Sequence, residues 1–322
     1  MKQYTSLYFV GAGGIGMSAL VRYFLAKGYK VAGYDRTQSP LTTELKTEGL
    51  EIVYEESVES IPDYCRNPET TLVVYTPAIP ASHSGLVYFR EHGFRVVKRA
   101  ELLGLITQSS RGLCFAGTHG KTTTSSMAAH IFHESPIGCN AFLGGILRNY
   151  NSNLILSEQS PFTVIEADEY DRSFHWLHPY MAVVTATDPD HLDIYGTEEA
   201  YLESFARFTS LIQPGGCLIM KKGIKLVPSV KENVKIYTYS ARDGGDFHAG
   251  NIRIGDGTIV FDFVTPEGVF ADIELGVPVE INIENAVAAM AIAWLNGVSG
   301  DDMRRAMASF KGAKRRFEFW VK

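Results

Sequence analysis

Short apolar runs separated by glycine turns and helical stretches dominate the N-terminal third of the chain. Four runs have the length of a buried strand and lie at residues 7–10, 30–35, 71–75 and 95–97. A helical pattern over 17–26 follows the first run and ends at Gly28, and another helical pattern begins at Arg99. This order of strand, helix and strand predicts βαβ units and therefore a Rossmann-like parallel sheet.

The same alternation resumes after a polar junction at residues 107–111. Further apolar runs lie at 112–116, 163–165, 181–185 and 216–220, and helical patterns lie at 122–133, 198–211, 282–295 and 299–310. Between 236 and 275 short alternating strands with glycine turns predict a small antiparallel β patch, whose first strand is 236–239. Asn282 is expected to act as the N-cap of its helix.

The overall composition is that of an ordinary soluble globular protein, with 45% hydrophobic and 20% charged residues. At ~100–200 residues per domain, the length predicts an α/β protein with two main domains, 1–107 and 108–311. A net charge of −6 without a basic stripe argues against nucleic acid as a partner. No apolar run approaches the ~18 residues of a membrane helix, and the first residues do not resemble a signal peptide. Four scattered cysteines are typical of a reduced protein, so we expect a cytoplasmic location.

A glycine turn follows the first predicted strand. Gly11, Gly13 and Gly16 fit the pattern G-x-G-x-x-G, and Asp35 ends the next strand at nearly the spacing of a dinucleotide-binding fingerprint. This pattern places a diphosphate at a helix N-terminus and an acid near a sugar or base. NAD and a UDP-sugar both satisfy that requirement, and a glycine turn also permits close packing of a helix on a strand. We expect a diphosphate site, and the second half of the chain favours a UDP-sugar over NAD.

A second glycine turn lies at residues 117–124, Gly-Thr-His-Gly-Lys-Thr-Thr-Thr, between a predicted strand and a predicted helix. The backbone N–H groups and the positive helix end of such a turn face an anion. Lys121 has the reach to contact the outer phosphates of ATP, and the hydroxyl of Thr122 is a ligand for Mg²⁺. A standard P-loop has a glycine five residues before the Gly-Lys pair, where this chain has Phe115. The turn predicts a P-loop-type ATP-binding central domain with a shortened loop.

Acidic residues follow two further strands of this second domain. Glu166 ends the run at 163–165, and the segment 188–193, Asp-Pro-Asp-His-Leu-Asp, follows the run at 181–185. Because parallel strands bring their carboxyl ends to one edge of a sheet, these residues are expected to converge with the phosphate loop. Glu166 is a candidate Mg²⁺ ligand, and His191 lies among acids where it would meet a metal ion or a phosphate.

Two other histidine pairs lack such surroundings. His130 with His133, and His175 with His178, have no cysteine or acidic partners at ligand spacing. Both pairs are therefore expected to be structural or to lie on the surface.

Four motifs together resemble the Mur ligases: Gly-Ala-Gly-Gly-Ile-Gly-Met-Ser at 11–18, the turn at 117–124, Glu-Ala-Asp-Glu at 166–169 and Asp-His-Leu-Asp at 190–193. The resemblance covers essentially the whole chain and is nearest to the members that add L-alanine to UDP-N-acetylmuramate in peptidoglycan synthesis. It implies that ATP phosphorylates the lactyl carboxylate and that the amine of L-alanine attacks the resulting acyl phosphate. During the first of these steps, Mg²⁺ and a lysine stabilise the charge that builds on the transferring phosphoryl group.

The resemblance also implies roles for individual residues. Lys121, Glu166 and His191 take the catalytic roles, and Thr122, Glu166 and His191 take the metal-binding roles. The residues implied for ATP are Gly117, Thr118, His119, Gly120, Lys121, Thr122 and Thr123, with Asn282 and Asn285 on the adenine side. The residues implied for the UDP-sugar are Gly11, Gly13, Gly14, Ile15, Gly16, Met17, Ser18 and Thr76, with Asp35 and Arg36 near uracil.

Some positions depart from the family pattern. Ile281 stands where the family often has a histidine before the adenine-side asparagines. Phe205 and Ala206 stand where later-acting members carry a carbamylated lysine, which agrees with the alanine-adding type. Residues 312–322 resemble the start of a junction with a third domain of roughly 130 residues, and without that domain the chain is expected to bind ligands but to ligate slowly or not at all.

Other functions stay open at this point. A recycling ligase that joins a preformed tripeptide to UDP-N-acetylmuramate has similar motifs, although the compact segment 170–175 is without the insertion associated with that type. A nicotinamide dehydrogenase explains the stretch from Gly11 to Asp35 but gives Lys121 and Glu166 no role. A binding module that keeps the ligand sites without turnover is a further alternative.

Overall fold

The computed structural model describes residues 3–242 and 244–314. The chain divides into two compact units, Met1–Ile106 and Thr107–Lys322, each with a sheet of its own. The sequence predicts a boundary one residue later, between residues 107 and 108, and residues 315–322 of the predicted linker at 312–322 lie outside the described residues. Within the described part of the chain, no helix combines the length and the apolar character needed to cross a bilayer.

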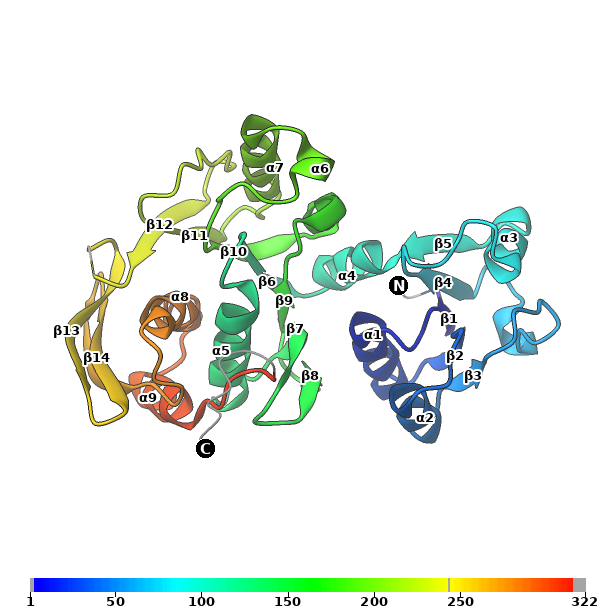
Figure 1. The fold of residues 1–322 in the computed structure, drawn as a ribbon, viewed down its shortest axis with the longest axis horizontal. Helices are drawn as coiled ribbons and strands as arrows, with labels where there is room; N and C mark the ends of the chain where they lie inside the picture. Colours follow the sequence, from blue (N-terminus) through cyan, green and yellow to red (C-terminus); the bar gives the residue numbers. More distant parts are fainter. Residues whose placement is uncertain (1–2, 243, 315–322) are drawn as a thin grey trace. The chain divides into compact units, whose positions relative to one another are not determined.

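The first unit is a five-stranded parallel sheet in the order β3-β2-β1-β4-β5 (Figure 1). Its strands are β1 (Ser6–Val10), β2 (Lys30–Tyr34), β3 (Glu51–Val53), β4 (Thr71–Tyr75) and β5 (Arg95–Lys98). Its helices are α1 (Ile15–Ala26), α2 (Pro40–Thr47), α3 (Ser84–Glu91) and α4 (Arg99–Gln108), with a short 3₁₀ helix η1 (Asp63–Cys65). The strand order reverses between β1 and β4, as in a Rossmann-type sheet, so the predicted fold class is confirmed.

The burial of β1 is consistent with its place in the middle of this sheet. All five of its residues are buried, as expected for a strand with neighbours on both sides and both faces covered. α1 packs on β1 and β2 and buries Leu20, Val21 and Phe24. The elements that the sequence did not predict, β3, α2 and α3, are short and partly exposed, so their apolar pattern is weak.

The second unit has a ten-stranded sheet in the order β15-β14-β13-β12-β11-β10-β6-β9-β7-β8. The strands up to β11 are β6 (Arg111–Ala116), β7 (Asn140–Leu147), β8 (Ser152–Ile155), β9 (Phe162–Glu166), β10 (Pro179–Val184) and β11 (Cys217–Lys221). The others are β12 (Lys235–Ser240), β13 (Phe247–Gly255), β14 (Thr258–Thr265) and β15 (Gly268–Glu274). The helices are α5 (Lys121–His133), η2 (Tyr170–Trp176), α6 (Leu192–Tyr195), α7 (Glu198–Ser210), α8 (Ile281–Leu295) and α9 (Gly300–Ser309).

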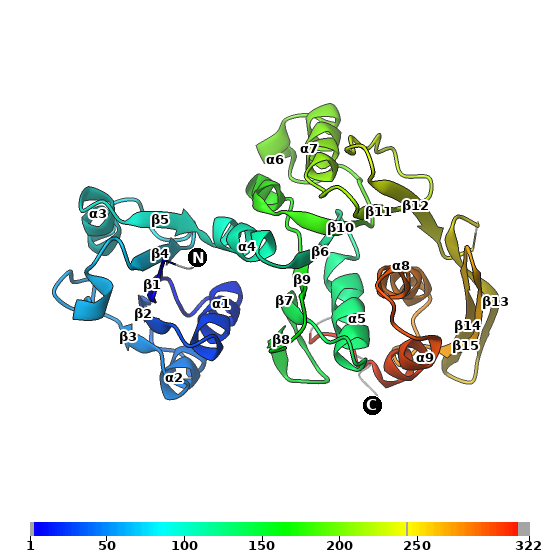
Figure 2. The same ribbon diagram turned by 180° about the vertical axis from the view of Figure 1, so that it is seen from behind.

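Helices α5 and α8 pack against each other and on the sheet, and both contribute to one large apolar core. Figures 1 and 2 show α7 on the opposite face of β10 and β11 from α5 and α8. The hydroxyl of Thr124 in α5 donates a hydrogen bond of 3.1 Å to Oδ1 of Asn285 in α8. The first turns of the two helices therefore lie side by side at the carboxyl edge of the parallel strands.

The predicted antiparallel patch is smaller than expected at one end. β12, which contains the predicted strand 236–239, pairs in parallel with both β11 and β13, so its assignment to the patch was wrong. Only β13, β14 and β15 form antiparallel pairs there, and they extend the parallel sheet. Polar and apolar residues alternate in the sequence of β12, as in an antiparallel strand, but its burial instead increases steadily from an exposed start to a buried end. The sequence also missed the antiparallel pair β7 and β8, because Gly144 and Gly145 interrupt the apolar run.

Asn282 is not the N-cap of α8, contrary to the sequence prediction. The helix begins at Ile281, and the N-cap position is Glu280, whose side chain makes no capping hydrogen bond. Asn282 is only 1% exposed, and its Nδ2 donates to the carbonyl of Val277 over 3.1 Å. Its Oδ1 accepts from Nδ2 of Asn285 over 3.2 Å, so the two asparagines form one buried pair in the first turns of the helix.

Candidate functional site

The glycine turn of the first unit is closed by the neighbouring strand. Gly11 has a φ of 89°, which favours glycine, and its N–H donates to the carbonyl of Tyr34 over 2.8 Å. The N–H of Gly13 donates to Oδ2 of Asp35 over 2.7 Å, and Oδ1 of Asp35 accepts from the N–H of Thr37 over 3.2 Å. The carboxylate that the resemblance placed near uracil thus binds the backbone of the turn itself.

Some of the remaining residues implied for the UDP-sugar lie at the exposed N-terminus of α1, and others are buried in the interior. Gly14 precedes α1 without a side-chain cap, and Ile15 is 54% exposed, so the first N–H groups of the helix face outward. Met17 and Ser18 are buried, and the hydroxyl of Ser18 donates to the carbonyl of Ile15 over 2.7 Å. Arg36 is exposed beyond β2, while the methyl group of Thr76 lies against Gly11.

The structure adds a basic residue to this helix end that the sequence did not suggest. A Cβ atom at Gly16 would lie 2.9 Å from Nη1 of Arg99, so the guanidinium lies directly against the first turn of α1. Arg99 is half-buried, and its guanidinium has no hydrogen-bonding or ion-pair partner among the described residues. The positive helix end and an arginine together form a site suited to an anion.

The phosphate loop lies between β6 and α5 and is fixed by the residues that follow β10. Gly117 and Gly120 have φ values of 138° and 84°, conformations that other residues adopt only with strain. The hydroxyl of Thr185 lies within hydrogen-bond distance of the carbonyls of Ala116 and His119, and the N–H of Thr118 donates to the carbonyl of Ala186 over 3.1 Å. The hydroxyl of Thr118 also donates to the carbonyl of Asp188. α5 has no side-chain cap, so its first N–H groups stay available to an anion.

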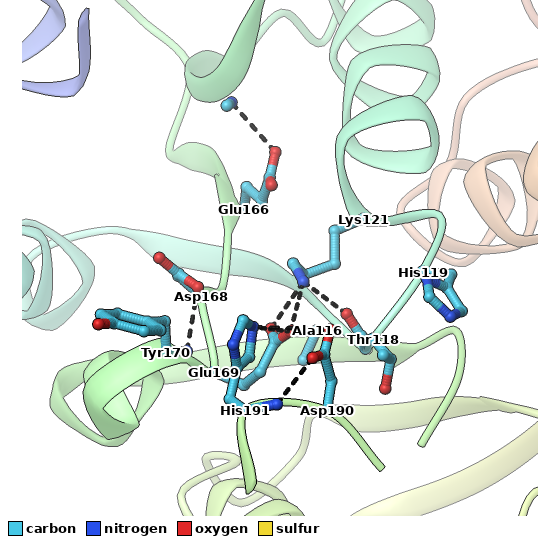
Figure 3. A network of polar contacts seen from close by, with 12 residues as sticks. Ala116, Thr118, His119, Lys121, Glu166, Asp168, Glu169, Tyr170, Asp190 and His191 are labelled. Atoms are coloured by element: carbon cyan, nitrogen blue, oxygen red, sulfur yellow. Dashed lines mark hydrogen bonds and ion pairs between the residues drawn. The ribbon is translucent and has the colours of Figure 1, made fainter. Parts of the chain in front are cut away.

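The ammonium group of Lys121 has two hydrogen-bond acceptors, one in the phosphate loop and one after β9. Its Nζ donates to the carbonyl of Gly117 over 2.7 Å and to Oε1 of Glu169 over 2.8 Å. Glu169 is only 1% exposed, and its Oε2 also lies 2.7 Å from Nζ. Figure 3 shows Lys121 and His191 next to the carboxylate of Glu169. The sequence motif 166–169 contains Glu169, but strand-end reasoning selected only Glu166.

Thr122 and Glu166 form the second polar pair of the site. The hydroxyl of Thr122 donates to Oε1 of Glu166 over 3.0 Å, and the N–H of Gly144 donates to Oε2 over 3.1 Å. Burial raises the pKa of Glu166, and the hydrogen bond from Thr122 opposes that shift. A hydroxyl and a carboxylate are oxygen donors that suit Mg²⁺. Among the described residues, no group of three or more histidine, cysteine or acidic side chains is arranged to hold a metal by itself, so an ion here would need phosphate or water oxygens as well.

His191 contacts the Lys121 side of the site and not the Thr122–Glu166 pair. Its Nε2 lies 4.0 Å from Oε1 of Glu169 and 3.8 Å from Oδ2 of Asp190. The rings of His191 and Tyr170 pack nearly perpendicular to each other, with their centroids 5.3 Å apart (Figure 3). His191 also has a φ of 52°, in the left-handed region, which is uncommon for residues other than glycine and is found at functional sites.

The two asparagines implied for adenine lie beside the phosphate loop. Besides its bond from Thr124, Oδ1 of Asn285 would lie 3.0 Å from a Cβ at Gly120. A cavity of about 390 Å³ opens at the start of α8. It is lined by Lys221, Ala241, Arg242, Glu280, Ile281, Ile283 and Glu284. Two ion pairs, Lys221 with Glu284 and Arg242 with Glu280, frame its apolar surface.

The two histidine pairs set aside in the sequence have protein partners. His130 is buried between the hydroxyl groups of Tyr150 and Ser309, at 2.6 Å and 2.9 Å, and burial lowers its pKa to about 4. Nε2 of His175 lies 2.9 Å from the carbonyl of Ser204, and Nε2 of His178 lies 3.0 Å from the amide of Gln108.

Both units of the chain match families of known proteins. The model of the Mur ligase family catalytic domain matches residues 6–111, and the model of the Mur ligase middle domain matches residues 115–293. The chain belongs to the Mur ligase family. It is 66% identical over 322 residues to the UDP-N-acetylmuramate–L-alanine ligase of Parabacteroides distasonis, covering all of this chain and 70% of that protein. It is 64% identical over 317 residues to the ligase of the same name from Phocaeicola vulgatus, covering 98% and 69% of the two chains.

Solved structures agree with the fold of this Mur ligase family member. The UDP-N-acetylmuramate–alanine ligase of Thermotoga maritima superposes with a TM-score of 0.80 at 24% identity, covering 98% of this chain and 71% of that chain. A ligase of the tripeptide-joining type from Neisseria meningitidis superposes with a TM-score of 0.82 at 22% identity, covering 97% and 100%. At these identities the superpositions show a shared fold, and they do not distinguish the two acceptors.

Proposed function

We propose that this chain carries the UDP-sugar and ATP sites of an ATP-dependent ligase that joins L-alanine to the lactyl carboxylate of UDP-N-acetylmuramate in peptidoglycan precursor synthesis. The observation that carries the proposal is the convergence of Lys121 with the Thr122–Glu166 pair at one edge of a parallel sheet. The 66% identity to a relative named for this reaction supports the choice of substrates.

In the second unit, the phosphate loop and Lys121 bind the phosphates of ATP. The N–H groups at the start of α5 face the anion, and the ammonium group of Lys121 neutralises charge that grows on the transferring phosphoryl group. Thr122 and Glu166 hold Mg²⁺, which supplies further charge stabilisation at the phosphoryl oxygens when bound. His191 faces the same ligand from the loop after β10, next to Glu169.

The adenine base binds in the cavity at the start of α8. The cavity lies near the phosphate loop in space, because Asn285, which follows its lining residue Glu284, contacts both α5 and the loop. Ile281 is 51% exposed and gives the cavity an apolar contact surface for a flat base. The departure from the family histidine at this position therefore exchanges a polar contact for an apolar one.

In the first unit, the open end of α1 and Arg99 bind the diphosphate of the UDP-sugar. The carboxylate of Asp35 holds the glycine turn in place by accepting a hydrogen bond from the N–H of Gly13. A charged arginine beside uncapped N–H groups is suited to two phosphate groups, and the exposed Arg36 extends this basic surface past β2.

The reaction needs two displacements. A lactyl carboxylate oxygen attacks the γ-phosphorus of ATP, which forms the acyl phosphate and releases ADP. The nitrogen of L-alanine then attacks the acyl carbon, loses a proton, and phosphate leaves from the tetrahedral intermediate. Lys121 contributes to the first displacement through its positive charge, which stabilises the negative charge that develops on the transferring group.

A tripeptide is the second candidate acceptor within the family, because the chain shares its fold with the Neisseria meningitidis ligase. The experiment below therefore includes it. The much higher identity to relatives named as L-alanine ligases favours the single amino acid. A nicotinamide dehydrogenase is disfavoured, because it gives the Lys121 and Glu166 arrangements no role.

Calorimetry with three ligands tests the proposal. UDP-N-acetylmuramate and Mg-ATP are each expected to bind, and NADH is not. Binding of NADH without Mg-ATP would overturn the ligase proposal. Phosphate release by a protein that joins these residues to the expected third domain, with L-alanine in one arm and the tripeptide in the other, then identifies the acceptor.

A further inference from the structure

The carboxylate of Glu169 links the two loops that meet at the phosphate site. Oε1 accepts the hydrogen bond from Nζ of Lys121 and lies 4.0 Å from Nε2 of His191. Oε2 lies 2.7 Å from the same Nζ but has no hydrogen bond of its own, so its contact with Lys121 is electrostatic. At 1% exposure this charge is nearly out of water, and an unpaired carboxylate would be costly there.

Lys121 has three N–H donors, and two of them are assigned in the structure. One binds the carbonyl of Gly117 and one binds Glu169, while the side chain is 13% exposed. Two fixed bonds remove most of the rotamer freedom of a long side chain, which is otherwise large for lysine. One N–H stays available to a phosphoryl oxygen.

Glu169 is itself fixed through its backbone. Its carbonyl accepts the hydroxyl of Tyr195 over 2.5 Å and the N–H of Arg172 over 3.0 Å. Tyr195 is 5% exposed, and the guanidinium of Arg172 lies over its ring at 4.8 Å. Asp171 and Arg172 both have left-handed backbone angles, with φ of 51° and 54°. Consecutive strained residues of this kind persist where the surrounding structure over-determines them, often at functional sites.

We propose that Glu169 is a positioning residue that holds the ammonium group of Lys121 at the phosphate loop, and that Tyr195 supports it from behind. The proposal rests on the proposed function only in naming a phosphate as the group that Lys121 meets. Glu169 itself does not touch the reacting atoms.

Glu169→Gln tests the proposal, because glutamine has nearly the same shape without the charge. In a nucleotide-free crystal structure of the variant, Nζ of Lys121 is expected to leave the carbonyl of Gly117. Retention of Nζ within hydrogen-bond distance of that carbonyl would overturn the proposal. Glu198→Gln is the matched control, because Glu198 forms a Lys–Glu pair with Lys225 on the surface. This readout needs no ligand, so it decides the positioning role even if wild-type protein fails to bind Mg-ATP and the proposed function is wrong.

Steady-state phosphate release, measured on a protein that joins these residues to the expected third domain, provides the second readout. Glu169→Gln is expected to lower kcat by about 10- to 100-fold and to change the KM for Mg-ATP by less than about threefold. Glu169→Asp keeps the charge on a shorter arm and is expected to recover part of kcat. Tyr195→Phe is expected to lower kcat in the same direction by a smaller factor. A wild-type kcat in Glu169→Gln, or tighter Mg-ATP binding by that variant, would contradict positioning, as would a change confined to thermal stability or to the Mg²⁺ requirement.

Discussion

The hydroxyl of Thr122 donates a hydrogen bond to Oε1 of Glu166 over 3.0 Å, joining the first turn of α5 to the carboxyl end of β9. The pair exists because β9 lies directly beside β6, the strand that leads into the phosphate loop. Adjacent parallel strands thus bring a hydroxyl and a carboxylate from 44 residues apart into one polar contact.

Glu166→Gln is expected to weaken Mg-ATP binding at least about tenfold, because the amide keeps the hydrogen bond from Thr122 but loses the charge that attracts Mg²⁺. Titration calorimetry over a range of Mg²⁺ concentrations measures the effect. Glu158→Gln removes an exposed charge elsewhere and serves as the control. An unchanged Mg²⁺ dependence in Glu166→Gln would rule out a ligand role for this residue.

Lys121→Ala is expected to reduce phosphoryl transfer by about 10²- to 10³-fold, because the transferring group loses its nearest positive charge. The affinity for UDP-N-acetylmuramate is expected to stay within about twofold, since that ligand is assigned to the other unit. Phosphate-release kinetics and calorimetry, both on a protein that joins these residues to the expected third domain, give the two values. A loss of both would mean that the assignment of ligands to the two units is wrong.

Arg99→Ala is expected to weaken UDP-N-acetylmuramate binding about tenfold without affecting Mg-ATP, because it removes the guanidinium beside the open end of α1. Arg99→Lys is expected to recover only part of the affinity, since an ammonium group does not bind phosphate in a bidentate manner. Arg95→Ala is the control, because Arg95 pairs with Glu101 at the surface. Equal affinities for the Arg99→Ala and Arg95→Ala proteins would exclude a phosphate contact by Arg99.

Asp35→Ala is expected to lower the free energy of unfolding by about 1 kcal/mol, because the N–H of Gly13 loses its acceptor. Asp35→Asn keeps an acceptor oxygen and is expected to lose less. Urea denaturation of both variants measures the difference, with the exposed Asp63→Ala as the control. If Asp35→Ala leaves stability unchanged and only impairs UDP-sugar binding, the carboxylate serves the ligand and not the turn.

Stability is expected to fall between pH 6.5 and pH 4 because of His130. Burial lowers the pKa of His130 to about 4, whereas the unfolded chain has the ordinary value near 6.5. In that window the unfolded chain binds more protons, so the free energy of unfolding decreases as the pH falls, by about 2 kcal/mol between pH 7 and pH 5.

Urea denaturation at the two pH values measures this loss in wild type and in His130→Gln. The variant is expected to lose less, because glutamine does not titrate, and His92→Gln, an exposed position, is expected to behave as wild type. The same loss in His130→Gln and wild type would assign the pH dependence to other groups.

The strands that flank the two glycine turns could be predicted because each is a continuous apolar run that ends at a glycine turn or a polar residue. β1 and β6 are almost wholly buried, and their pattern leaves no alternative to a central strand. β12 was assigned to the wrong kind of pairing because a half-exposed strand looks the same in a parallel and an antiparallel pair. Asn282 was taken for a cap because asparagine is favoured there, but a buried bond to Val277 outweighs that preference.

Chemical identity along the chain determined which residues can bind phosphate, metal and sugar, because glycine turns, a lysine and carboxylates at strand ends are local features. It did not determine which of those groups meet. Lys121 pairs with Glu169, Glu166 pairs with Thr122 and Arg99 lies against Gly16 only because strand order and helix packing bring distant segments together. A carboxylate at position 166 and another at 169 look alike in the sequence. In the structure, the carboxylate of Glu166 faces Thr122 in α5 and Gly144 in β7. The carboxylate of Glu169 is buried and faces the ammonium group of Lys121. The two residues differ in role because they differ in direction and in burial.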